Sequence, residues 1–103
     1  MGRALSSATG LVLDALARGV RHGFDILDAT GLPSGTVYPI LRRLEQDGFA
    51  VSRWEPARLA HDEQRPPRRY YTLTASGEGL ATKARARFPA LSGIPARART
   101  RRA

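Results

Sequence analysis

The side chains best suited to binding chemistry lie between positions 34 and 46. Apolar Val37, Leu41 and Leu44 recur at i, i+4 and i+7, which predicts a helix with one buried face. At about 100° per residue, hydroxyl, phenol and guanidinium groups project from the opposite face. Such groups suit phosphate oxygens and base edges. The residues of this exposed face are Gly35, Thr36, Tyr38, Pro39, Arg42, Arg43 and Gln46.

The sequence also marks both ends of this helix. Ser34 is a candidate N-cap and Gly48 a candidate residue just past the C-terminus. Pro39 removes one backbone hydrogen bond and presses its ring on the carbonyl four residues back. That residue is Gly35, whose backbone has room to adjust, so we expect the proline to cost little here.

Composition and charge indicate a small module with a polyanionic partner. The chain has 103 residues, a formal net charge of +8 and a pI near 11.4, which predicts one domain that binds nucleic acid or an anionic membrane surface. The membrane is the weaker alternative, since no apolar run approaches roughly 18 residues and the N-terminus lacks a signal-peptide pattern. We therefore expect a cytoplasmic protein without a membrane partner.

The residue types needed for metal binding and catalysis are scarce. Cysteine is absent, which excludes a disulfide framework and a thiolate metal site. His22 and His61 are the two imidazoles and lack metal-ligand spacing. No Gly-rich phosphate loop, paired carboxylates or histidine-centred arrangement occurs. The sequence predicts no metal, no cofactor and no enzyme activity.

Two further helices precede residue 34. The pattern at 7–18 predicts a helix capped by Ser6 or Ser7, on which Leu11 and Ala15 either complete the core or form a partner-facing seam. Residues 24–30 predict a short helix whose buried face is Phe24 with Leu27. A tight turn at 31–33 then leads into the longer helix, which is helix-turn-helix spacing.

A hairpin follows the third helix. Alternation over 49–54 and the Tyr- and Thr-rich segment 69–74 predict two paired strands. Tyr70 and Tyr71 alternate, so one packs inward and the other outward, and the pattern leaves open which. The connecting loop at 55–68 is long and rich in arginine and proline. It is either a wing or an ordinary solvated loop.

The last predicted helix begins after Thr74 and ends at Pro89. Its apolar positions Leu80, Ala84 and Phe88 recur every four residues. We expect residues 1–89 to form the domain and residues 90–103 to be a disordered basic tail.

Three separated motifs together resemble the winged-helix domain of PadR-type transcriptional regulators. The similarity runs from about residue 11 to 84, in a short form that lacks an extended C-terminal region. One departure is Gln64, since family members usually have a glycine before the wing arginine. The motif residues are His22, Gly23, Phe24; Ser34, Gly35, Thr36, Val37, Tyr38, Pro39, Leu41, Arg43, Leu44, Glu45; Arg65, Pro66, Arg69, Tyr70, Tyr71, Thr72, Leu73, Thr74 and Gly77.

The resemblance implies a mainly α fold with a small β-hairpin, a winged helix-turn-helix. It implies a bacterial homodimer that binds double-stranded DNA and regulates transcription, as a repressor in our interpretation; no effector follows from it. The helix with Ser34, Gly35, Thr36, Tyr38, Pro39 and Arg42 would enter the major groove. The wing residues Arg65, Arg68 and Arg69 would approach the backbone or minor groove. The predicted dimer seam is Leu11, Ala15, Leu80, Ala84 and Phe88.

Two other functions share some of these features. A winged helix can serve as a protein-interaction module without specific DNA binding, but such a module gains nothing evident from so many arginines. RNA binding shares the charge, yet the exposed aromatic platform expected for single strands is missing from the pattern. For Tyr38 the alternatives are phosphate contact and a phenol packed on the flank of the helix.

Overall fold

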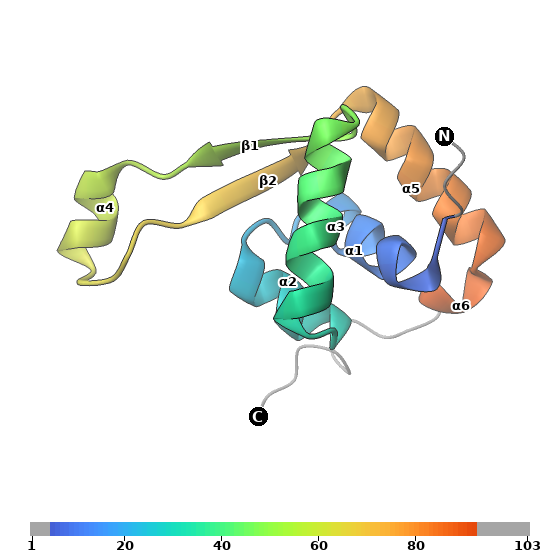
Figure 1. Cartoon of the computed structure of the whole chain (residues 1–103), viewed down its shortest axis with the longest axis horizontal. Helices are drawn as coiled ribbons and strands as arrows, with labels where there is room; N and C mark the ends of the chain where they lie inside the picture. The colour runs from blue at the N-terminus through green and yellow to red at the C-terminus, as the bar shows by residue number, and fades with distance from the viewer. Residues whose placement is uncertain (1–4, 93–103) are drawn as a thin grey trace.

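The computed structural model describes residues 5–92. In chain order the elements are α1 (Ser7–Ala17), α2 (Gly23–Thr30), α3 (Ser34–Gln46), β1 (Ala50–Trp54), α4 (Ala57–Asp62), β2 (Arg69–Leu73), α5 (Ala75–Arg87) and α6 (Pro89–Ser92). Five of these helices, α1, α2, α3, α5 and α6, form a body from which a two-stranded antiparallel hairpin projects, with the short helix α4 at its far end (Figure 1). This is the winged helix-turn-helix arrangement that the sequence predicts.

The core forms where α1, α2 and α3 meet. Val37 and Leu41 of α3 are fully buried, as their spacing predicts, and α1 contributes Val12 and Leu13 to the same cluster. Ile26 of α2 is also fully buried, and the same cluster extends to Leu73 of β2 and Ala81 of α5. With these apolar faces inward, the polar face of α3 must point to solvent.

The hairpin has two distinct faces. Ser52 pairs with Tyr71 and Trp54 with Arg69, and directly opposed residues share a face of the sheet. This inner face turns toward α3, and Tyr71 is only 8% exposed. Tyr70 therefore lies on the outer face, against His22 at 5.6 Å between ring centres.

Three helices end in the same Schellman motif, in which a residue with positive φ follows the C-cap. Gly19 ends α1 and Gly48 ends α3, with φ of 92° and 83°. Gln64 ends α4 with φ of 56°, and the backbone N–H of Arg65 donates to the Ala60 carbonyl at 3.1 Å. This left-handed conformation favours glycine, so a glutamine at position 64 adopts it at an energetic cost.

Two local predictions are wrong. Phe24 was expected in the core but is 75% exposed, because α2 buries Ile26 and Ala29 while Leu27 packs only partly. Ser34 is the first residue of α3 and caps nothing, because Pro33 occupies the N-cap position and offers no side-chain acceptor. By contrast, Ser6 and Thr74 cap α1 and α5 as expected.

The expected long loop and tail also need correction. The segment 55–68 contains α4, so the wing ends in a helix. α6 extends through Ser92, beyond the expected boundary at 89, and the rest of the predicted tail, 93–103, lies outside the described residues. No helix within residues 5–92 is long and apolar enough to span a bilayer.

Two residues of the expected dimer seam belong to the protomer's own interior. Ala15 is 3% exposed and Ala84 2% exposed, because α1 and α5 pack against each other within one chain. Leu11, Leu80 and Phe88 are half-buried, so part of each side chain remains accessible to a second copy of the chain.

Gly77 permits the closest approach between α5 and the hairpin. A Cβ atom there would lie 1.9 Å from the Phe49 carbonyl oxygen, whereas nothing described lies within 4 Å of a Cβ at Gly79 in the same helix. We predict that Gly77→Ala lowers the free energy of unfolding by roughly 1–3 kcal/mol through overpacking. Gly79→Ala should raise it by about 0.5–1 kcal/mol. Urea unfolding of both variants checks this, and equal effects would contradict it.

Candidate nucleic-acid interface

The exposed face of α3 is open to solvent along its length. Pro39, Arg42 and Arg43 are exposed, and Thr36 is half-buried. Within residues 5–92, neither Arg42 nor Arg43 forms an ion pair, so both guanidinium groups are available to an anionic partner. Arg42 lies one turn after Tyr38, on the side of α3 that faces the hairpin.

Tyr38 leans from α3 toward the start of α2. A Cβ atom at Gly23 would lie 2.1 Å from the Tyr38 hydroxyl oxygen, so the glycine makes room for the phenol. The ring is still 38% exposed. Tyr38 is thus packed on the flank of α3 while part of its surface stays accessible.

A hydrogen-bond network fixes the hairpin to α3. The Ser52 hydroxyl donates to the Glu45 carboxylate at 2.6 Å, and Nε of Arg69 donates to the Ser52 oxygen at 2.9 Å. A second Arg69 nitrogen lies 3.4 Å from Glu45, and its guanidinium stacks 5.4 Å from the centre of the Trp54 ring. Arg69 is therefore engaged within the protein and helps to orient the wing.

Glu55 ties together the two ends of the wing. Its carboxylate accepts hydrogen bonds from two guanidinium nitrogens of Arg65 and, at 2.8 Å, from the backbone N–H of Arg68. Its own N–H donates to the Arg68 carbonyl at 2.9 Å. These donors, with Arg65 the strongest, lower the pKa of Glu55 from 4.5 to about 2.

The three predicted wing arginines are thus in different situations. Arg65 is held by Glu55 and Arg69 by Glu45, whereas the Arg68 side chain forms no ion pair within the described part of the chain. The sequence reasoning gave Glu55 no role and named Glu45 only as one residue of the family motif. The feature of the sequence that could have indicated their roles is that each is an isolated acidic residue near several arginines.

Among residues 5–92, no group of three His, Asp or Glu side chains is arranged to hold a metal ion. What α3 and the wing offer is a set of guanidinium groups, a phenol and exposed backbone on neighbouring surfaces. Such groups suit the phosphates and base edges of a duplex.

The Glu55 network makes stability depend on pH. Because folding lowers the pKa of Glu55 from 4.5 to about 2, its stabilising effect is complete above pH 4.5 and is lost as pH falls toward 2. We predict that urea unfolding shows a smaller loss of stability across this window in Glu55→Gln than in the wild type. Glu78→Gln removes the same charge from exposed α5 and should keep the wild-type slope; the same slope in Glu55→Gln would contradict the assignment.

Comparison with known proteins gives a consistent set of relatives. The sequence model of the transcriptional regulator PadR-like family matches residues 12–83. A PadR-like transcription factor from Bacteroides fragilis shares 26% identity and a TM-score of 0.64, with 82% of each chain covered. The protein smu.1704 from Streptococcus mutans UA159 shares 24% identity and a TM-score of 0.66, with 89% of this chain and 87% of that chain covered.

A third similar structure is that of BpsR from Bordetella bronchiseptica, whose DNA binding is regulated by 6-hydroxynicotinic acid. It shares 22% identity and a TM-score of 0.66 over 86% of this chain. This chain spans only 63% of the BpsR chain. No curated protein sequence matches.

The family match includes the helix-turn-helix, the hairpin and most of α5. Those are the elements that carry the exposed face of α3 and the wing arginines. The chain therefore belongs to the PadR-like family of transcriptional regulators.

Proposed function

We propose that the protein is a sequence-specific regulator, acting as a repressor in the cytoplasm, that inserts α3 into the major groove of double-stranded DNA. The observation that carries this is the exposed face of α3, where Arg42 and Arg43 lie free of described ion pairs beside Pro39. Guanidinium groups at such a position can read guanine edges or bind phosphates. The proposed major-groove residues are Ser34, Gly35, Thr36, Tyr38, Pro39, Arg42 and Arg43.

The wing has a different proposed role. Arg68 would contact the sugar–phosphate backbone or the minor groove directly. Arg65 and Arg69 are already bonded to carboxylates, so their contribution to DNA binding would come mainly from fixing the shape of the wing. The arginines after residue 92 would add sequence-independent affinity through counterion release.

Arg42 provides the direct test of base reading. We predict that Arg42→Ala weakens binding by about 1–3 kcal/mol and relaxes the preference at one base position. The measurement is selection from a random duplex pool, followed by titration of the selected duplex. Arg87→Ala removes an equal charge from exposed α5 and should weaken all duplexes slightly without changing the preferred sequence.

The same titration separates the alternatives. A uniform loss across all sequences would make Arg42 a phosphate contact, and unchanged affinity would remove it from the interface. A folded protein that binds no duplex would favour a winged-helix protein-interaction module instead.

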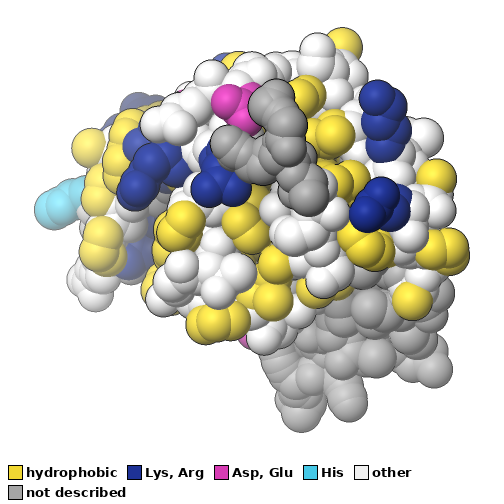
Figure 2. All heavy atoms as spheres, turned by 45° about the vertical axis from the view of Figure 1, so that its right-hand side comes forward, with side chains coloured by type: hydrophobic (Ala, Val, Ile, Leu, Met, Phe, Trp, Pro, Cys, Tyr) yellow, Lys and Arg dark blue, Asp and Glu magenta, His cyan; other side chains and the backbone are white. Residues whose placement is uncertain are grey.

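We further propose a homodimer, because one recognition helix reads few base pairs and a two-fold pair reads two half-sites about 10–10.5 bp apart. The half-buried Leu11, Leu80 and Phe88 of α1 and the C-terminal part of α5 are the proposed contacts. The face on which α5 comes forward carries apolar side chains beside Lys and Arg and shows few acids (Figure 2). Two copies would cover this apolar surface.

Sedimentation tests the dimer. We predict that Leu80→Glu shifts the protein toward a monomer, because it places two like charges in the seam. Leu59→Glu makes the same change on α4, where Leu59 is 46% exposed, and should leave the association state unchanged. Analytical ultracentrifugation with and without the selected duplex gives the result. A wild-type monomer in both conditions, bound one to one, would rule out the dimer.

A further inference from the structure

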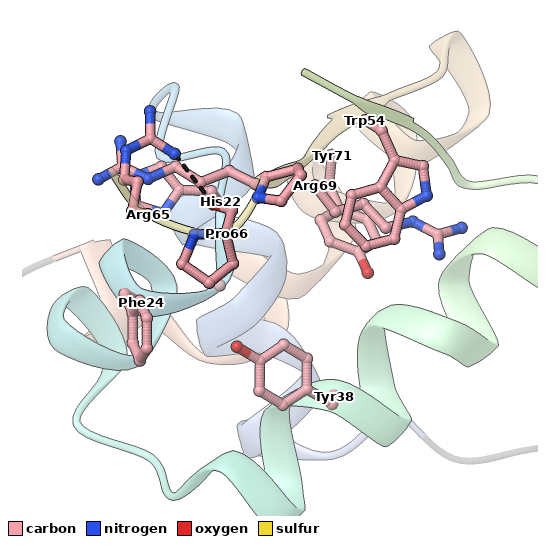
Figure 3. A pocket seen from close by; sticks show the side chains of 11 residues that line it. His22, Phe24, Tyr38, Trp54, Arg65, Pro66, Arg69 and Tyr71 are labelled. Atoms are coloured by element: carbon pink, nitrogen blue, oxygen red, sulfur yellow. Dashed lines mark hydrogen bonds between the residues drawn. The ribbon is translucent and has the colours of Figure 1, made fainter. Parts of the chain in front are cut away.

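A cleft of about 450 Å³ lies between α3 and the inner face of the hairpin. Tyr38 points into it from α3, Phe24 borders it from α2, and Trp54 and Pro66 close it from the wing (Figure 3). Its wall is mostly apolar. None of these aromatic side chains is needed to fill the core.

The aromatic side chains of this cleft are unusually exposed. Phe24 is 75% exposed, Trp54 59% and Tyr38 38%. Only two other large hydrophobic residues in the described chain are exposed, and neither borders the cleft. Clustered apolar side chains on the surface of a small protein mark a contact site.

Most polar groups at the rim are already bonded within the protein. His22 lies 3.0 Å from the Asp25 carboxylate, Arg69 bonds to Glu45, and Arg65 to Glu55. This leaves the Arg68 guanidinium and the Tyr38 hydroxyl for a ligand. The cleft therefore suits a chain in which apolar faces alternate with anionic groups.

The sugar–phosphate backbone of DNA has that chemistry, and position favours it too. The cleft separates α3, which the proposed function places in the major groove, from the wing, which it places at the backbone or minor groove. One strand of the duplex runs between the major and minor grooves. Deoxyribose is apolar at C2′, where ribose carries a hydroxyl that both donates and accepts hydrogen bonds.

We propose, resting on the proposed function, that this cleft seats one backbone strand, with deoxyribose rings against Trp54 and Phe24 and phosphate on Arg68. In this arrangement the apolar wall discriminates against ribose. A 2′-hydroxyl placed against the Trp54 and Phe24 rings loses its water partners and gains no hydrogen bond from these rings, which is unfavourable. Trp54 is thus a specificity-determining residue for the type of nucleic acid, in addition to the sequence readers of α3.

The test replaces one deoxyribonucleotide at a time by the corresponding ribonucleotide, at each position of both strands of the selected duplex. At one or two positions per half-site, the ribonucleotide should weaken binding about tenfold. A 2′-fluoro nucleotide at the same position keeps the ribose-like sugar pucker without the hydroxyl donor, and should bind nearly as well as deoxyribose. Equal losses for both sugars would assign the effect to helix geometry and overturn the proposal.

Two variants connect the effect to the cleft. Trp54→Ala should weaken binding to the all-deoxy duplex several-fold and abolish the penalty at the sensitive positions. Val51→Ala is the matched control, since Val51 is 55% exposed on the opposite face of the same strand, and it should retain both affinity and penalty. Circular dichroism verifies that both variants fold.

The outcomes distinguish a failure of the cleft proposal from a failure of the proposed function on which it rests. Tight DNA binding by Trp54→Ala with an unchanged ribose penalty overturns the cleft proposal and leaves the proposed function standing. A wild-type protein that binds no duplex overturns both.

Discussion

The burial of one face of α3 is the constraint on which the remaining structure depends. Val37 and Leu41 are fully buried with Leu13 of α1, and each buried side chain of this size contributes about 1.5–3 kcal/mol. Rotating α3 about its axis would expose them, so the direction of its polar face is fixed. Pro39 lies on that face, where its ring disturbs no packing.

Features encoded within a few residues could be predicted from the sequence. The period of α3, the turn at Gly48 and the Thr74 cap depend on local geometry alone, and all agree with the structure. Phe24 could not be placed this way, because α2 has only eight residues and several of its rotations bury some apolar side chain. Its orientation is set by packing against α1 and α3, which periodicity within α2 does not contain.

The roles of the wing arginines were beyond sequence reasoning for a related cause. Arg65 lies ten residues from Glu55 and Arg69 lies 24 residues from Glu45, so both ion pairs exist only once the hairpin has formed. The sequence could count the cations but could not show which of them folding would neutralise. Arg42 forms no ion pair within residues 5–92, because Glu45, its acidic neighbour at i+3, is already bonded to Ser52 and Arg69.

Two carboxylates lie beside the surface proposed to bind DNA, and negative charge at such a place opposes the approach of a polyanion. Glu45 and Glu55 each reduce the local positive charge, yet each holds a long arginine side chain in one conformation. Ordering a free arginine at an interface costs about 0.5–1.5 kcal/mol on binding. In these two ion pairs the arginine is already ordered when the protein has folded, so binding does not carry that cost. The wing then presents a fixed shape, while Arg42, Arg43 and Arg68 would supply the attraction in the proposed complex with DNA. Shape and attraction thus come from different residues, so salt should screen the attraction while the geometry of the wing persists.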